Sequence, residues 1–172
     1  LFLTRPLLQQ TQVALKELCK NLPPNLLFIC STPIFAQGRL YECAVVIQGG
    51  DILGYVPRIK IPHASTHLRN FSPSHTANFD SYEDVPFGPD LRFVFGDTRI
   101  AITFGIPMDA SIYHDAHLLL CLDASPEGVG KSKRRCEALN SLSHTSGCAC
   151  VYVNAGMGES STDGVYSGQR IL

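Results

Sequence analysis

The sequence predicts a layered α+β or α/β domain with a mixed sheet, because two kinds of strand connection occur along it. A Gly-Gly pair at residues 49–50 separates two apolar, strand-like runs, which predicts a tight antiparallel hairpin. Farther along, strand-like runs at residues 117–122 and 148–154 flank a helical pattern at residues 130–143. That order is typical of a strand–helix–strand unit, whose two strands run parallel.

The first half of the chain is expected to contribute one helix and three strands. Residues 6–22 carry apolar side chains near helical spacing, and a Pro-Pro pair ends the pattern. Residues 25–35 form an apolar run of the kind that is buried on both faces of a sheet. Strands at residues 41–48 and 51–56 flank the Gly-Gly turn.

The second half follows an irregular, Pro-rich stretch at residues 57–90, which predicts a long surface loop. Strands are expected at residues 91–95 and 99–104, followed by a short elbow with up to one helical turn at residues 105–113. The strand at 117–122 is expected to be central, and Gly147 to cap the following helix. The chain should end in a further strand that begins at residue 165.

Composition excludes several classes of function. Apolar residues make up 45% and charged residues 17% of the 172 residues, which indicates one globular domain or part of one. The net charge of -1 gives no electrostatic case for binding nucleic acid or an anionic membrane. No apolar run is long enough for a transmembrane helix. Seven cysteines, an odd number, are expected to be reduced thiols of a cytoplasmic protein.

Both ends of the sequence look cut. The chain starts at Leu1 rather than Met, and it stops at Leu172 inside a strand-like run. We therefore expect residues 1–172 to be a fragment of a longer polypeptide.

Two segments carry a family resemblance. Residues 41–62 read YECAVVIQGGDILGYVPRIKIP, and residues 155–163 read AGMGESSTD, followed by Tyr-Ser-Gly at residues 166–168. The first segment resembles a hairpin and P-K segment of the carbon–nitrogen hydrolase (nitrilase) superfamily. The second resembles the signature of one branch, the amino-terminal glutaminase domain of glutamine-dependent NAD synthetase. The resemblance extends over nearly the whole chain.

The resemblance implies a fold and a chemistry. The fold is a four-layer α-β-β-α sandwich, present here in part. The family uses a Glu–Lys–Cys triad, in which the Cys thiolate attacks the side-chain amide of glutamine and forms a thioester. The released ammonia serves a separate synthetase domain, which uses ATP and magnesium to amidate nicotinic acid adenine dinucleotide to NAD. No cofactor is implied for this chain, and glutamine, the synthetase domain and other subunits of a homo-oligomer are the implied partners.

Position by position, the triad is not intact. The family Glu belongs to a strand upstream of Leu1, the family Lys corresponds to Arg58, and the family Cys corresponds to Gly105. Arg58 keeps the positive charge but is a larger, planar group. Gly105 offers no nucleophile, and rescue by another thiol such as Cys121 is not favoured. We therefore expect that this chain alone does not hydrolyse glutamine.

The positions that hold the substrate are better retained. Ser125 and Lys131 match family residues that contact bound glutamine, where a hydroxyl and an ammonium suit the substrate carboxylate. The alternative is structural, with Ser125 capping the following turn and Lys131 solvated. The aromatic positions of another family loop correspond to Ala64 and His67, which weakens the case for a glutamine pocket.

Other interpretations of the sequence have less support. His63, His67, His75 and His114 show no ligand spacing, so no metal site is predicted. Two alternative functions stay open beside the glutaminase-type domain. One is a pseudo-amidase that serves as a scaffold or oligomerisation domain, and the other is a nitrilase-like amidase of different specificity.

Overall fold

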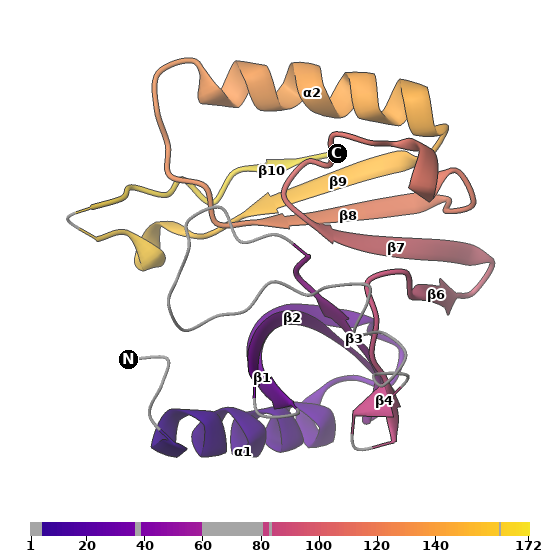
Figure 1. Ribbon diagram of the computed structural model, residues 1–172, viewed down its shortest axis with the longest axis vertical. Coiled ribbons are helices and arrows are strands. Elements are labelled where there is room, and N and C mark those ends of the chain that lie inside the picture. The colour runs from indigo at the N-terminus through magenta and orange to yellow at the C-terminus, as the bar shows by residue number, and fades with distance from the viewer. Residues whose placement is uncertain (1–4, 37–38, 60–80, 83, 162) are drawn as a thin grey trace. The chain divides into compact units, whose positions relative to one another are not determined.

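The computed structural model describes residues 5–36, 39–59, 81–82, 84–161 and 163–172. The chain divides into two compact units, Leu1–Leu91 and Arg92–Leu172. Figure 1 shows α1 lying along the sheet of the first unit and α2 along the sheet of the second. Within the described ranges, no helix combines the length and apolar character needed to cross a membrane. Ala64, His63, His67 and His75 lie outside the described residues.

The first unit is an antiparallel three-stranded sheet in the order β1-β2-β3, with one helix and a small two-stranded ribbon. The hairpin prediction is confirmed: Gln48 pairs with Asp51 across the turn. Gly49 and Gly50 have φ angles of +61° and +96°, which residues other than glycine rarely adopt. The elements are α1 (Arg5–Asn21), β1 (Phe28–Ala36), β2 (Arg39–Gln48), β3 (Asp51–Pro57), β4 (Ser81–Tyr82) and β5 (Val85–Pro86).

The prediction that the first strand is buried on both faces is wrong. In β1, Ile34 is buried while its neighbour Phe35 is 53% exposed, so the strand alternates. The physical reason is that β1 is at the edge of its sheet, whereas β2 is in the middle. The strand buried on both faces is β2, where Cys43 and Ala44 are each 0% exposed.

The second unit has a five-stranded sheet in the order β10-β9-β8-β7-β6. The three middle strands are parallel, and the two edge strands are antiparallel to their neighbours. The strand predicted to be central, now β8, is therefore central. The elements are β6 (Arg92–Phe95), β7 (Thr98–Phe104), η2 (Ser111–Tyr113), β8 (Leu118–Asp123), α2 (Lys131–Ser146), β9 (Ala149–Asn154), η3 (Met157–Glu159) and β10 (Arg170–Ile171).

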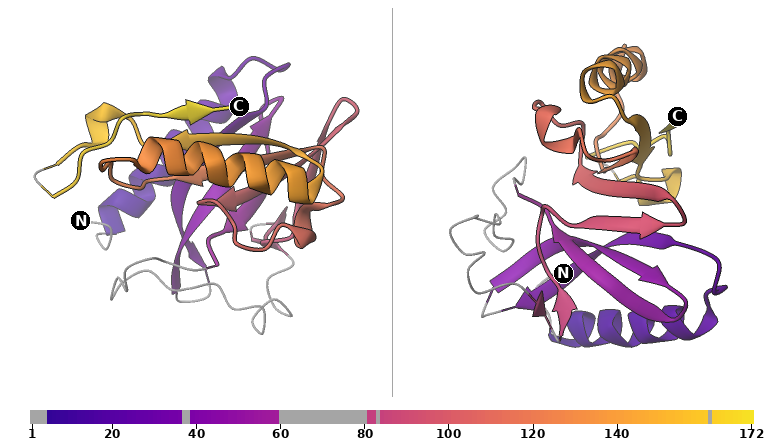
Figure 2. Two further views of the ribbon diagram at one scale, coloured as in Figure 1. Left: turned by 90° about the horizontal axis from the view of Figure 1, so that it is seen from above. Right: turned by 90° about the vertical axis from the view of Figure 1, so that its right-hand side faces the viewer.

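The helix α2 lies against the sheet over β9 (Figure 2). Leu139 and Leu142 of α2 belong to one buried cluster with Leu119 and Cys121 of β8. Gly147 ends the helix at a φ of +72°, and its N–H donates to the carbonyl of Ser143 (2.9 Å), as the sequence predicts. This packing fixes the segment from the end of β8 to the start of α2, which carries two of the predicted site residues.

The last strand is shorter than predicted. β10 contains only Arg170 and Ile171, although a strand was expected from residue 165. The intervening backbone makes loop contacts instead, since the carbonyl of Val165 accepts from the N–H of Glu127 (2.7 Å). The end of the chain is thereby tied to the loop that follows β8.

Candidate functional site

The carboxyl ends of the parallel strands β7, β8 and β9 meet at one edge of the second unit's sheet. The N–H of Gly105 donates to the carbonyl of Leu122 (2.7 Å), and the N–H of Ala155 donates to the carbonyl of Asp123 (3.0 Å). Ligands of open α/β sheets bind at this kind of edge, so it is the candidate site. The loops that leave this edge carry Gly105 and Ser125, and Lys131 is the first residue of α2, which follows the Ser125 loop.

Gly105 adopts a backbone conformation that glycine favours. Its φ angle is +72°, and a Cβ atom built there meets no described atom within 4 Å. The position therefore has room for a side chain, but the left-handed backbone disfavours one. As it stands, Gly105 contributes backbone groups and no nucleophile.

Cys121 does not replace the missing nucleophile. It lies within β8, opposite Thr103 of β7, and it is 0% exposed. Burial raises the pKa of the Cys121 thiol to about 12, and the neighbouring Cys150, Cys148 and Asp123 act in the same direction. Because the thiolate is the reactive form, a thiol held neutral at this depth is inert.

Replacing Gly105 by Ala is expected to lower the free energy of unfolding by about 1 kcal/mol, the cost of a side chain in the left-handed region. Urea unfolding followed by circular dichroism measures the change. The matched control is Gly156→Ala, because Gly156 also has open space around it but a φ of -73°. An equal loss in both variants would show that the backbone angle at Gly105 is not the cause.

Ser125 is fixed from several directions. Its N–H donates to Oδ1 of Asn154 (3.0 Å), and its carbonyl accepts from Nδ2 of the same side chain (3.0 Å). Nη2 of Arg135 donates both to the Ser125 carbonyl and to Ser125 Oγ, each at 3.2 Å. The interpretation that Ser125 only caps a turn therefore misses these contacts, which come from β9 and α2.

Arg135 is a site residue that the sequence analysis missed. It is 7% exposed and forms an ion pair with Glu127 and a hydrogen bond to Oε1 of Gln169 (2.8 Å). Glu127 also accepts from Oγ of Ser167 (2.6 Å) and from Nδ2 of Asn154 (3.3 Å). These donors, Ser167 first and then Arg135, hold the pKa of the Glu127 carboxyl below its usual range. The arrangement keeps a charged pair at the strand ends.

A sequence signal for Arg135 does exist. Arg135 precedes Leu139 by four residues and Leu142 by seven, which places it on the buried face of a helix. A buried arginine needs an acidic partner, and Glu127 is available in the preceding loop. Arg135 also lies over the ring of Tyr152, with its guanidinium carbon 5.6 Å from the ring centre.

Lys131 is the first residue of α2, and it contacts the loop that carries Ser125. Its Nζ donates to the carbonyl of Pro126 (2.6 Å), the residue that follows Ser125. An ammonium has three hydrogens, so this contact leaves two for a ligand. Lys131 is half-buried, because its side chain folds over Gly128. It is therefore not a fully solvated lysine.

Arg58, the remaining predicted site residue, lies in the first unit just after β3. Its Nη1 contacts both carboxylate oxygens of Glu42, at 3.0 and 3.2 Å, and its N–H donates to the Glu42 carbonyl (2.8 Å). The Arg58 side chain is 12% exposed and that of Glu42 is 25% exposed. The guanidinium is thus held by a half-buried carboxylate.

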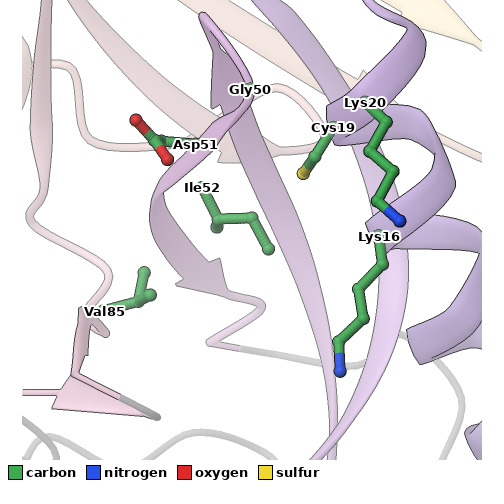
Figure 3. Close-up of a pocket in the computed structure, with 7 residues that line it drawn as sticks. All are labelled: Lys16, Cys19, Lys20, Gly50, Asp51, Ile52 and Val85. Carbon is green, nitrogen blue, oxygen red and sulfur yellow. The ribbon is translucent and has the colours of Figure 1, made fainter.

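A separate groove of about 440 Å³ lies in the first unit, between α1, the β2–β3 turn and β5. Figure 3 shows Lys16 and Lys20 on one wall, with the Asp51 carboxylate pointing away from both ammonium groups. The groove contains none of the predicted site residues. Its lining residues are Lys16, Cys19, Lys20, Gly50, Asp51, Ile52 and Val85.

Metal-ligating side chains do not gather in the described part of the chain, where no three His, Cys, Asp or Glu residues are placed to hold an ion. Of the four histidines considered as metal ligands, His114 is the one that is described, and it lies beside the Ser111 carbonyl. All seven cysteines are free thiols. The chemistry that the site offers is therefore hydrogen bonding and charge, from Ser125, Lys131 and the Arg135 network.

Comparison with known proteins gives relatives of one kind. The glutamine-dependent NAD(+) synthetases of Mycobacterium bovis and Mycobacterium tuberculosis are each 30% identical to the chain over 162 residues, and that of Mycobacterium leprae is 28% identical. Each match covers 84% of this chain and 23% of the relative, so the chain spans less than a quarter of the length of the curated relatives it matches. No family model matches the chain.

Solved structures show the fold. A glutamine-dependent NAD(+) synthetase from Cytophaga hutchinsonii superposes on 98% of the chain with a TM-score of 0.83 at 22% identity, covering 29% of that protein. The enzyme from Acinetobacter baumannii, solved with ADP, gives 0.78 at 17% identity and 31% coverage. A CN-hydrolase superfamily protein from Xanthomonas campestris gives 0.60 at 11% identity, and the chain covers 68% of it. The predicted α+β, nitrilase-like fold is confirmed.

Proposed function

Because the chain is homologous to the amino-terminal part of the glutamine-dependent NAD(+) synthetases, we propose that it is the glutaminase-type domain of such an enzyme. The full-length protein would amidate nicotinic acid adenine dinucleotide to NAD, in the cytoplasm and within a homo-oligomer. ATP and magnesium would bind in a synthetase domain outside residues 1–172. The homology over 84% of the chain carries this proposal.

Within that enzyme, we propose that this chain binds glutamine and does not hydrolyse it. Hydrolysis by the family route needs a thiolate to attack the amide and a cation to stabilise the oxyanion. Gly105 has no thiol, and Cys121 is buried and neutral. Arg58 is already held by Glu42. In contrast, Ser125 and Lys131 keep a hydroxyl and an ammonium for the substrate carboxylate.

We expect the purified chain to release ammonia from glutamine no faster than buffer does, and to form no thioester. A coupled ammonia assay and mass spectrometry of the protein after incubation with glutamine measure the two outcomes. The Mycobacterium tuberculosis relative is the positive control. Ammonia release above background would contradict the proposal, and its loss in a Cys121→Ser variant would then locate the nucleophile.

The absence of a nucleophile at Gly105 also favours a second candidate. In this case the domain is a pseudo-amidase that serves only as a scaffold or oligomerisation domain, while the synthetase domain uses free ammonia. Isothermal titration with glutamine separates the two candidates, since the scaffold binds none. A nitrilase-like amidase of other specificity has less support, because it too requires a nucleophile.

A further inference from the structure

The hydrogen bonds of the Ser125 hydroxyl group can be counted from the structure. A serine oxygen has one hydrogen to donate and two lone pairs to accept with. Arg135 Nη2 fills one lone pair of Ser125 Oγ at 3.2 Å. No acceptor for the Ser125 hydroxyl hydrogen exists among the described residues. The hydroxyl is half-buried, and so its hydrogen is available to an oxygen that enters from outside.

Arg135 is held so that it keeps this contact. The ion pair with Glu127 and the bond to Gln169 Oε1 both use Nη1, which leaves Nη2 for Ser125. A guanidinium has a rigid, planar arrangement of donors, so fixing one nitrogen orients the other. A cation that donates to Oγ also withdraws electron density from it, which makes the hydroxyl a stronger donor.

A second positive group is anchored to the same loop. Lys131 Nζ contacts the carbonyl of Pro126, the residue after Ser125, and retains two hydrogens. The Ser125 hydroxyl has one hydrogen to donate and Lys131 has two, so both groups can donate to an incoming group. The ligand chemistry that suits such donors best is an anionic oxygen, such as a carboxylate.

From this arrangement we propose that Arg135 is a positioning residue. It holds Ser125 through Nη2 and thereby orients the Ser125 hydroxyl to donate to the carboxylate of the bound ligand. Arg135 itself does not contact the ligand. The inference rests on the proposed function, because glutamine is the carboxylate that this domain would bind.

The interaction between Arg135 and Ser125 is tested in the absence of a ligand. Arg135→Lys keeps the positive charge beside Glu127 but removes the second nitrogen, which donates to Ser125. We expect the Ser125 amide to exchange with solvent about tenfold faster in this variant, as the loss of one charge-assisted hydrogen bond implies. Hydrogen exchange by NMR measures it. Arg134→Lys is the matched control, because Arg134 is the exposed neighbour that contacts only the Val129 carbonyl (3.3 Å).

The role toward the ligand is tested by a double-mutant cycle with L-glutamine, measured by isothermal titration. Arg135→Lys is expected to weaken binding about tenfold in the wild-type background and to have no further effect in a Ser125→Ala background. Equal weakening in both backgrounds would overturn the positioning role. Unchanged exchange at Ser125 would do so as well.

Failure of the proposed function has a different result. If the wild-type chain binds no glutamine, the proposed function is wrong, and the assignment of a ligand to Ser125 falls with it. The exchange rates then still decide whether Arg135 holds Ser125. Unchanged melting of Arg135→Lys relative to Arg134→Lys shows that both variants are folded.

Discussion

Replacing Arg135 by Met is expected to lower the free energy of unfolding by about 3 kcal/mol. The substitution keeps much of the side-chain volume but leaves the Glu127 carboxylate without its cation. It also removes the donors to Gln169 Oε1 and to the Ser125 carbonyl. We place the loss at the lower end for a broken buried pair because the Glu127 side chain is 22% exposed.

Urea unfolding at neutral pH measures this loss, with Arg134→Met as the control. Arg134 is exposed and adjacent on α2, so its replacement is expected to change stability by less than about 0.5 kcal/mol. A double variant, Glu127→Met with Arg135→Met, should recover part of the loss, because removing both partners leaves no unpaired charge. A loss below about 1 kcal/mol for Arg135→Met would mean that the ion pair contributes little to the fold.

Raising the pH from about 8 to about 10 is expected to lower the free energy of unfolding by several kcal/mol. Burial raises the pKa of Cys121 from 9.0 to about 12 and that of Cys150 to about 11, and it raises the pKa of Cys43 as well. These thiols stay protonated in the folded chain but ionise when the chain unfolds. Since their folded pKa values are the higher ones, the stabilisation is present below about pH 9 and is lost as the pH rises.

Urea midpoints measured with a phosphine reductant across this pH range provide the test. A single such thiol contributes on the order of 1 kcal/mol at pH 10, so Cys121→Ala should reduce the pH-dependent loss by about that amount. The variant must be compared with itself at pH 8, because the cavity it creates costs stability at every pH. A pH-independent midpoint would show that these thiols are not buried as described.

Local patterns in the sequence predict most of the elements of the fold. The Gly-Gly turn and the Gly147 cap are local, since each depends on a backbone angle that few residues tolerate. The exposure of β1 could not be predicted in the same way. An apolar run has the same sequence pattern whether its strand is at the edge or in the middle of a sheet. The position of β1 at the edge depends on pairing between distant segments.

The candidate site was predicted only where a residue is recognisable by itself. Gly105, Ser125 and Lys131 follow from matching motifs. The first two lie on loops at one edge of the sheet, and Lys131 begins α2. Arg135 was not predicted as a site residue, because a run of basic residues at a helix start does not show which of them is buried. Its burial depends on Glu127 and on Gln169, which is 34 residues farther along the chain. Contacts of that range are set by tertiary packing.

The open space at Gly105 bears on the history of the protein. Glycine and cysteine codons can differ by a single base, so one mutation is enough to exchange the two residues in either direction. No described atom occupies the space that the added Cβ would take, and the left-handed backbone is the main obstacle. An added Cβ would meet none of the described neighbouring side chains. Under the proposed loss of the nucleophile, the exchange at this position is a step that selection could reverse.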